Sequence, residues 1–532
     1  MSRGESRFID AAVAAALAAL AVLLYRKILR LWWMYDDAFL VNMLRPASIA
    51  DTFHDRALYA KLGRPIFNPL LMLSLKLDLR QFGLDTHALY VHQLVAFALL
   101  PALLYLLFRL WSGRVVSALA VAIFTIGGPT LQVVPQLMLR HYIEGAVFAT
   151  AAVILFVVAI RRQSWPLALA SAFLYFCGAA AKEVYAPVIL ILAAMPEGSP
   201  RQRLRFAVPH AVAAVAFIVW RGVVIGWSVA PFGFVVPAEK RPLAILTIPL
   251  RAAREFAGSG TAAGWALLVM VLVCAAVAVV RLRGARLLAA AAIVAAVAPL
   301  IPVAGEMNPR WAFAPWLLAA VPIALLPLAL PRAGKVVVAV TFLVALVAWR
   351  VEWARGYRLF LRMSDEARVF AALGSDDVLR DPATPPASLQ ELGRMTGSGA
   401  RAFYDDLPLC DSTSHFGRLF EYDPGNRQVH ETTPANLRRS CASIRRMPLE
   451  LTLHFERDGA FYWTAGPYRD GTWAFILWDG LIGYEVPREG GFRSPELERF
   501  NLRVRYTSPA GWKTYSPILR VDSRNGPLLF RQ

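Results

Sequence analysis

Charged residues are scarce in this 532-residue sequence, and their scarcity excludes the class of protein that the length alone favours. Only 17% of the residues are charged and 57% are hydrophobic, whereas a soluble chain carries roughly a quarter charged residues. The hydrophobic residues form long uncharged blocks, several of which reach or approach the roughly 20 residues that cross a bilayer core. We therefore expect a polytopic membrane protein instead of a series of soluble domains.

Acidic residues are fewer than basic ones, and a net charge of +19 is a common property of nucleic-acid-binding proteins. The arginines exclude that class, because they are scattered between hydrophobic blocks instead of forming one basic face. Five short connections are basic and hold no acidic residue, as cytoplasmic loops do. They lie at 109–114, 161–162, 201–205, 281–286 and 332–335. Basic residues also follow the first block, on the side that would then be outside. The five short loops carry more weight for orientation, so we predict a cytoplasmic N-terminus.

The apolar blocks predict about eleven transmembrane helices. The first block lacks a convincing cleavage site, so we expect it to be retained as a span. An odd number of spans places the C-terminus outside, together with a long first loop at 31–86. The expected spans are 8–25, 88–110, 115–133, 143–160, 165–181, 184–195, 206–229, 264–280, 285–304, 311–330 and 335–353.

Cysteine is also rare, with four residues in the chain. Cys177 and Cys274 lie in apolar blocks and are expected to act as small hydrophobic residues. Cys410 and Cys441 lie in the polar C-terminal part. They could form a disulfide if that part faces an oxidising compartment, and an unpaired, buried state is the alternative.

The composition changes after about residue 355, which predicts three parts. Residues 1–355 form the transmembrane domain, 356–390 an amphipathic helix and a proline-rich linker, and 391–532 an extracytoplasmic β-rich domain. Alternating residues and glycine-containing turns after Leu449 predict a small antiparallel β-sandwich. Its strands are expected at 451–455, 460–463, 472–477, 502–506 and 518–521. The aromatic residues of this part form either its core or a platform for sugar or acceptor.

Asp36 and Asp37 are adjacent carboxylates at the start of the first outer loop, just after Trp32 and Trp33. Tryptophan settles at membrane interfaces, and charge so close to a bilayer is costly. One interpretation is a solvated helix end. The other is a general base that takes a proton from an acceptor hydroxyl, while the second carboxylate positions it or holds a divalent cation.

Several cations lie where predicted spans meet the outer face. Lys182 and Glu183 separate two apolar blocks, and Arg310 and Arg140 lie in outer loops. Each cation alone is more often a snorkelling anchor than a ligand. Their gathering on the face that carries the acidic pair favours a site where they hold a lipid-linked phosphate.

These segments, in this order, resemble membrane glycosyltransferases of the GT-C superfamily, in particular the protein O-mannosyltransferase-like and tetratricopeptide-linked mannosyltransferase group. The resemblance covers roughly residues 10–330 and is carried by 35–42, 63–65, 128–140, 181–183 and 310–315. The C-terminal part departs from the group, because it is not a helical tetratricopeptide array.

The resemblance implies an inverting glycosyltransferase with a GT-C-like fold and a polyprenyl-phosphate-linked sugar as donor. Asp36 is the expected base, and Asp37 its orienter, an alternate base or a metal ligand. Lys182, Arg310 and Arg140 are expected at the lipid phosphate, with Arg64 and Glu183 in supporting ion pairs. Residues of lower rank are Asn42, His54, His92 and Glu306.

Two other functions stay open. A polysaccharide polymerase or ligase also uses lipid-linked sugars, but its working residues usually lie in a large later loop. A transporter or flippase predicts charges near the middle of the membrane and paired repeats with broken helices. High alanine, arginine and leucine usage indicates a bacterial inner membrane, with the C-terminal part in the periplasm. The acceptor is a glycan, a lipid or a protein.

Overall fold

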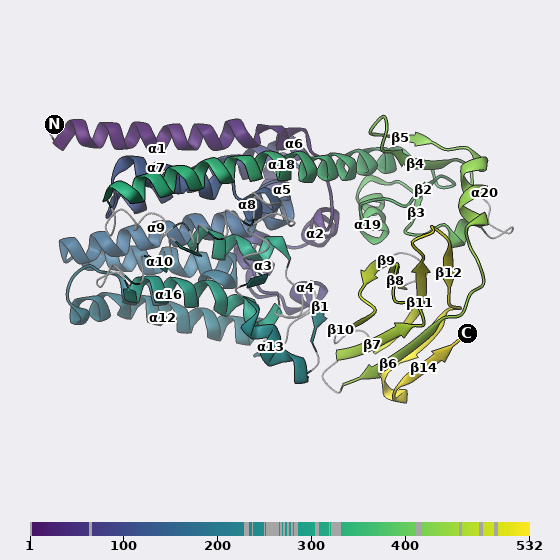
Figure 1. The fold of residues 1–532 in the computed structure, drawn as a ribbon. Helices are drawn as coiled ribbons and strands as arrows, with labels where there is room; N and C mark the ends of the chain where they lie inside the picture. Colours follow the sequence, from purple (N-terminus) through teal and green to yellow (C-terminus); the bar gives the residue numbers. More distant parts are fainter. Residues whose placement is uncertain are drawn as a thin grey trace.

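The computed structural model has a bundle of helices at one end and a β-rich region at the other (Figure 1). It describes residues 3–62, 66–227, 233–236, 238–248, 250–251, 265, 269, 272–273, 276–277, 280, 286–303, 308–318, 320, 331–410, 416–456, 460–477, 482–493 and 498–532. Predictions that fall on Arg64 and Glu306 lie outside these residues.

Four helices of the described chain are long and apolar enough to cross a membrane, and they indicate a membrane protein. They are Arg7–Arg30, Thr86–Arg109, Leu137–Arg162 and Pro200–Ile225. Shorter apolar helices are Arg114–Thr125, Trp165–Ala181, Glu183–Ala194 and Arg286–Ile301. The prediction of about eleven spans is therefore wrong. The predicted spans at 264–280 and 311–330 lie largely outside the described residues.

Apolar blocks overestimate helix length because glycine and proline end helices inside them. The predicted span at 115–133 is two helices, since α7 (Arg114–Thr125) stops just before a Gly-Gly-Pro sequence and α8 (Gly128–Val133) follows. The predicted span at 184–195 is a short 3-10 turn, η3 (Glu183–Tyr185), followed by the seven-residue helix α11 (Val188–Ala194).

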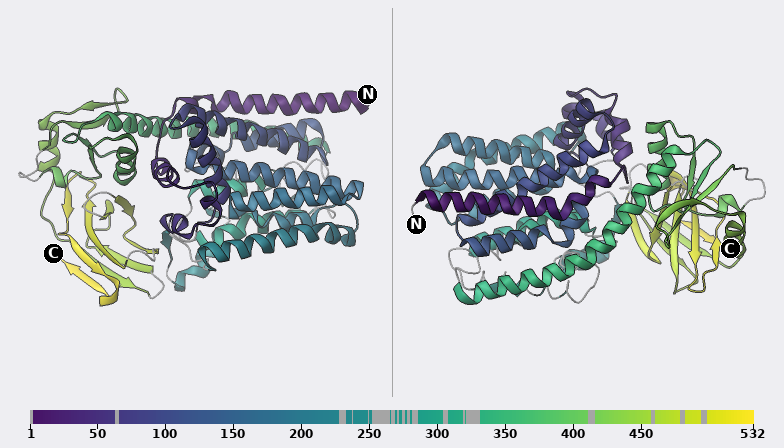
Figure 2. Two further views of the ribbon diagram at one scale, coloured as in Figure 1. Left: turned by 180° about the vertical axis from the view of Figure 1, so that it is seen from behind. Right: turned by 90° about the horizontal axis from the view of Figure 1, so that it is seen from above.

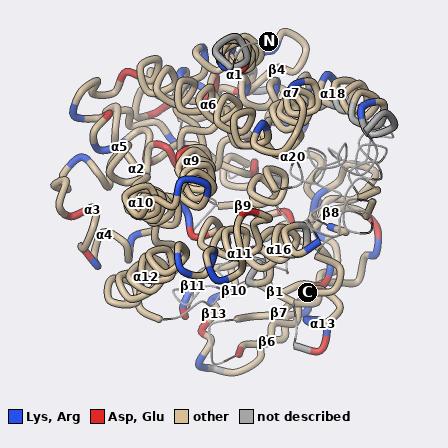
Figure 3. The backbone as a smooth tube through the Cα atoms, turned by 90° about the vertical axis from the view of Figure 1, so that its left-hand side faces the viewer, with Lys and Arg blue, Asp and Glu red and all other residues tan. Residues whose placement is uncertain are grey.

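The centre of the bundle is a pair of adjacent helices, α9 (Arg140–Arg162) and α10 (Trp165–Ala181). Glycines allow the two to approach closely, because a Cβ on Gly145 would lie 3.3 Å from the carbonyl oxygen of Gly178. Their connection carries arginines at the end of the bundle that lies away from the β-rich region (Figure 3). Helices α6 (Thr86–Arg109) and α12 (Pro200–Ile225) pack against this pair, and α1 (Arg3–Tyr25) packs on the outside of α6.

The first loop, at 31–86, is mostly helical and lies at the end of the bundle nearest the β-rich region (Figure 2). Short helices follow one another here because prolines and aspartates start them: α5 has Pro69 at its first position, and the Asp55 carboxylate accepts the N–H of Ala57 at the start of α4. The helices are α2 (Asp37–Leu44), α3 (Asp51–His54), α4 (Arg56–Lys61) and α5 (Pro69–Phe82).

One 42-residue helix, α18 (Pro331–Ala372), connects the bundle to the β-rich region. The sequence predicts a span at 335–353 and a separate amphipathic helix after residue 355, and the structure corrects this division. Residues 353–357 hold no proline, and the single Gly356 does not end the helix, so backbone hydrogen bonding continues through this segment. The Tyr357 hydroxyl donates to the carbonyl oxygen of Lys27 at 3.0 Å, which ties α18 to the end of the first helix.

The β-rich C-terminal region is confirmed, and it contains three sheets. Two of them share one core, to which Leu453, Trp463, Phe475 and Leu502 contribute. The five predicted strands are present, and β9, β10, β12 and β14 were not predicted. The strands are β6 (Glu450–Phe455), β7 (Ala460–Gly466), β8 (Thr472–Leu477), β9 (Ile482–Val486), β10 (Glu489–Arg493), β11 (Arg499–Thr507), β12 (Lys513–Tyr515), β13 (Leu519–Asp522) and β14 (Leu528–Arg531).

The third sheet lies between α18 and this sandwich and was not predicted. Its order is β3-β2-β4-β5, with β2 parallel to both neighbours. It begins at Val378, so the predicted linker at 356–390 is part of the folded C-terminal region, as is the helix α19. The elements are β2 (Val378–Arg380), α19 (Pro386–Thr396), β3 (Arg401–Phe403), β4 (Leu419–Asp423) and β5 (Gln428–Glu431).

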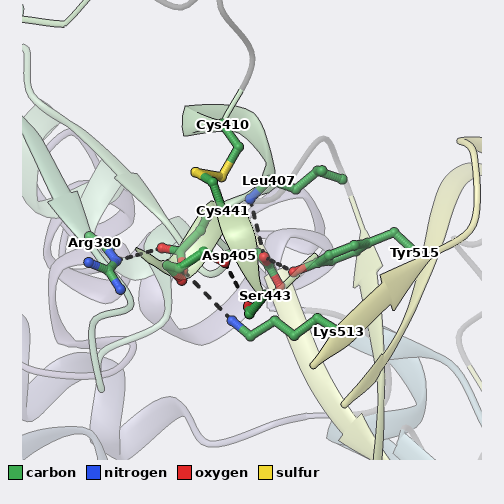
Figure 4. Close-up of a disulfide and its surroundings, with 10 residues drawn as sticks. Arg380, Asp405, Leu407, Cys410, Cys441, Ser443, Lys513 and Tyr515 are labelled. Atoms are coloured by element: carbon green, nitrogen blue, oxygen red, sulfur yellow. Dashed lines mark hydrogen bonds and ion pairs between the residues drawn. A yellow bond between two sulfur atoms is a disulfide. The ribbon is translucent and has the colours of Figure 1, made fainter. Parts of the chain in front are cut away.

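Cys410 and Cys441 form a disulfide beside this third sheet (Figure 4). Next to it, Arg380 donates to Asp406 at 2.6 Å, and Arg505 of β11 donates to Asp405 at 2.6 Å. These contacts join the third sheet to the sandwich. A second link comes from the helical region, because β1 (Gly233–Val235) pairs with β10 of the sandwich.

Candidate functional site

The acidic pair lies at a strained turn between the first helix and α2. Tyr35 has a φ of 48°, in the left-handed region that a bulky residue rarely adopts. Such strain costs about 1 kcal/mol or more and gathers at functional sites. The turn sends the two aspartate side chains in different directions, so that Asp37 is buried and Asp36 is exposed to solvent.

Asp37 connects the first loop to the segment before α9. One carboxylate oxygen accepts the N–H of Met34 at 3.0 Å and the other accepts the N–H of Met138 at 3.0 Å. Burial raises the pKa of Asp37 to about 7, although both hydrogen bonds oppose the shift. Both oxygens are thus engaged with backbone, which identifies Asp37 as the residue that positions the turn.

Replacing Asp37 by asparagine is expected to lower stability and to flatten its pH dependence. The folded-state pKa of about 7 lies above the ordinary value of 3.8, so the folded chain holds a proton that the unfolded chain has released between these values. Wild-type stability therefore falls as pH rises across this window, by up to about 1.4 kcal/mol per pH unit. Thermal midpoints in nanodiscs at about pH 5 and about pH 8 test this. An equal pH dependence in both proteins would contradict it.

Asp36 has a different environment. Its side chain reaches solvent, but protein atoms lie on most sides of it. Burial raises its pKa, while Arg310 and a hydrogen bond with Ser388 lower it. Ser388 belongs to α19 of the C-terminal region. Asp36 therefore lies where the helical bundle and the C-terminal region meet, with solvent access that Asp37 lacks.

Two cations lie at the same end of the bundle. Lys182 follows α10 and places its ammonium group 5.3 Å from the centre of the Tyr142 ring. Arg310 lies in η7 (Pro309–Ala312) and acts electrostatically on Tyr35, Asp36 and His141. His141 is also within electrostatic range of Lys182. Among the described residues, neither Lys182 nor Arg310 forms an ion pair with a carboxylate, so both charges can meet an anion.

Arg140 lies elsewhere, in a buried network between α5, α6 and α9. Its side chain has no solvent exposure; it forms an ion pair with Asp78 and donates to the carbonyl oxygen of Leu89 at 2.8 Å. His92 contacts Asp78 at 2.8 Å, and Ser74 donates to Glu144 at 2.5 Å. The cation is already neutralised, so the structure does not present Arg140 to a phosphate.

The remaining predicted residues make supporting contacts. Glu183 forms an ion pair with Arg221 of α12 at 2.7 Å instead of with its neighbour Lys182. Asn42 donates to both the backbone and the carboxylate of Glu391, at 2.7 and 3.0 Å, and thereby joins α2 to α19. His54 is exposed and hydrogen-bonds the Ala50 carbonyl of its own helix at 2.7 Å.

Three residues of the site were not identified from the sequence. Ser388 was assigned to a linker, and nothing in its surroundings predicts contact with residue 36. His141 follows Arg140 directly, and its neutral side chain gives no charge signal at a membrane boundary. Tyr35 carries no charge, and its left-handed backbone is a property of the fold. Across the described ranges, no group of three or more His, Cys, Asp or Glu residues gathers as metal ligands would.

Neither the models of known protein families nor the curated proteins match this chain. The glycosyltransferase resemblance therefore rests on the residues quoted above.

Proposed function

We propose that this chain is a GT-C-like membrane glycosyltransferase that moves a sugar, with inversion, from a polyprenyl-phosphate-linked donor to an acceptor. The observation that carries the proposal is that solvent-exposed Asp36 lies within electrostatic range of Arg310, which with Lys182 also acts on His141. Within the described chain neither cation forms an ion pair. A base beside an anion-binding pair at the end of a helical bundle is the arrangement that this transfer needs.

In this mechanism the Asp36 carboxylate accepts the proton of an acceptor hydroxyl. The hydroxyl oxygen forms a bond to the anomeric carbon of the donor sugar while the bond from that carbon to the phosphate oxygen breaks. The lipid phosphate leaves with an additional negative charge, which Lys182 and Arg310 stabilise. Attack opposite the leaving phosphate inverts the anomeric carbon. Asp37 holds the turn through Met34 and Met138 and takes no proton from the acceptor hydroxyl.

In this proposal, helix α19 of the C-terminal region covers the site. Ser388 hydrogen-bonds Asp36, and Glu391 accepts from Asn42. Both residues lie in α19, which packs against α2. The acceptor reaches Asp36 between these helices and the bundle.

The proposed orientation places this end of the molecule outside a bacterial inner membrane, in the periplasm. Arginine-rich connections lie at the opposite end of the bundle, which fits the cytoplasmic side. The disulfide between Cys410 and Cys441 fits an oxidising compartment for the C-terminal region.

Removing both cations is expected to weaken donor use. In K182M/R310M, the Michaelis constant for the lipid donor should rise by at least about tenfold, because a hydrogen bond to a charged group contributes about 1.5–3 kcal/mol. Kinetics in proteoliposomes with a labelled donor measure this, and the exposed pair R438Q/R446Q of the C-terminal region removes the same charge as a control. An unchanged Michaelis constant would overturn the assignment of the phosphate to Lys182 and Arg310.

The same vesicles separate the transferase from a transporter. The transferase proposal expects label in an acceptor product and no solute flux that depends on the protein. Flux without any labelled product would favour the transporter and reject the proposal.

A further inference from the structure

A groove on the outer surface of the first loop carries a second cluster of positive charge, separate from the candidate site. It has a volume of about 630 Å³ and lies between the end of α2, the start of α3 and α5. Arg45, Lys76 and Arg80 line it, and none of its described lining residues is acidic. Asp36, Lys182 and Arg310 are not among them.

The three cations are available to a ligand to different degrees. Arg45 and Arg80 are exposed, and within the described chain neither forms an ion pair. Lys76 donates to the carbonyl oxygens of Leu44 and Arg45 at 2.9 and 3.0 Å, which leaves one N–H of its ammonium group for a ligand. These two bonds hold the lysine over the groove.

One carboxylate beside the groove offsets part of this charge. Asp51 accepts the N–H of Ser48 at 2.6 Å and lies within electrostatic range of Lys76. Hydrogen bonds from Ser48 hold the pKa of Asp51 below its ordinary value, so it stays ionised. Three cations against one carboxylate leave a net positive groove that fits a phosphate.

The surrounding surface places this groove at the level of lipid head groups. On α5, Leu77 beside Lys76 is 45% exposed. A short turn then leads to α6, a candidate membrane span, where Val91, Val95 and Leu99 are exposed by 40%, 55% and 52% at successive helical turns. Apolar side chains exposed along one face of a span contact lipid tails. Lys76 and Arg80 lie on α5, which ends four residues before α6 begins, so we expect the groove at the level of lipid phosphates.

We propose that the groove formed by Arg45, Lys76 and Arg80 binds the phosphate of an anionic membrane lipid. The bound head group fastens the first outer loop to the bilayer beside α6. This proposal does not depend on the glycosyltransferase function, because none of these residues belongs to the candidate site.

Native mass spectrometry of the full chain in detergent tests the proposal. The protein is mixed with equal amounts of phosphatidylglycerol and phosphatidylcholine that carry the same acyl chains, and the ratio of bound lipids is measured. Wild type should prefer phosphatidylglycerol, and R45Q/R80Q should lose about tenfold or more of that preference. The control R438Q/R446Q should keep it. Both replaced arginines are exposed, and the single variant R80E should reduce the preference as well.

Three results would overturn the proposal. The first is an unchanged lipid preference in R45Q/R80Q. The second is an equal loss in R438Q/R446Q, which would make the effect one of total charge. The third is displacement of the lipid by glycerol phosphate at an equal concentration, which would make the groove a site for a soluble phosphate.

Discussion

Replacing Asp36 by asparagine is expected to lower the rate of sugar transfer by a factor of about 10² to 10⁴, the usual contribution of a general base. Asparagine keeps the size of the side chain and its hydrogen bond with Ser388, but it cannot take a proton. Because burial raises the pKa of Asp36 above its ordinary value, wild-type activity should also fall on the acid side at a pH higher than for a free aspartate. Initial rates across pH in proteoliposomes measure both effects.

Asp470, an exposed aspartate of the C-terminal region, supplies the matched control. D470N should transfer at the wild-type rate, and D36N should bind the lipid donor as well as wild type does, because Lys182 and Arg310 are unchanged. Wild-type transfer by D36N would remove Asp36 from the mechanism. In that case the transfer rate of D37N decides the role of Asp37. If D37N folded and bound the donor normally but transferred sugar about 10² to 10⁴ times more slowly than wild type, Asp37 would be the base.

Replacing Arg140 by methionine is expected to destabilise the chain by about 3–5 kcal/mol, because it leaves a buried carboxylate without its cation. Arg140 has no solvent exposure and pairs with Asp78, which is 4% exposed. His92 can compensate only in part. Thermal midpoints in nanodiscs measure the loss, and the double variant R140M/D78L should recover part of it, since a buried pair can be exchanged for apolar residues.

Arg161 is a control on the same helix. It forms an ion pair with Glu197 at 2.8 Å, but its side chain is 43% exposed, and such pairs contribute about 1 kcal/mol or less. R161M should therefore lower the thermal midpoint far less than R140M. If R140M were as stable as R161M but could not bind the lipid donor, Arg140 would be a ligand of the donor and not a structural residue.

The sequence predicts a helical N-terminal region and a β-rich C-terminal region, but it overestimates the number of spans. The scarcity of charge predicts a membrane protein, and alternation predicts strands such as β6 to within one residue of its bounds. The number of spans is wrong because hydropathy does not show where a helix ends inside an apolar block. Helix α7, for example, ends at Thr125 within such a block. Sheet β3-β2-β4-β5 was missed because its strands are short and because β2 pairs in parallel with two strands that are distant from it in the sequence.

The candidate site was predicted in part. The sequence identifies the acidic pair, Lys182 and Arg310 because each is a charged residue next to an apolar block, where charge is costly. It does not show which residues these four contact. Asp37 meets Met138 and Asp36 meets Ser388 only through tertiary packing, so the different roles of the two aspartates required the structure. For the same reason the sequence could not separate buried Arg140 from Lys182 and Arg310.

The donor is the most direct test of the proposed function. Purified full-length protein in proteoliposomes should be supplied in parallel with a labelled polyprenyl-phosphate sugar, a nucleotide sugar and a polyprenyl-diphosphate oligosaccharide, together with membrane extract as the source of acceptor. Label should pass to a product from the polyprenyl-phosphate sugar alone, with inverted anomeric configuration, and D36N should abolish this transfer. Transfer from the diphosphate oligosaccharide instead would favour a polymerase or ligase, and transfer from the nucleotide sugar or with retained configuration would contradict the account.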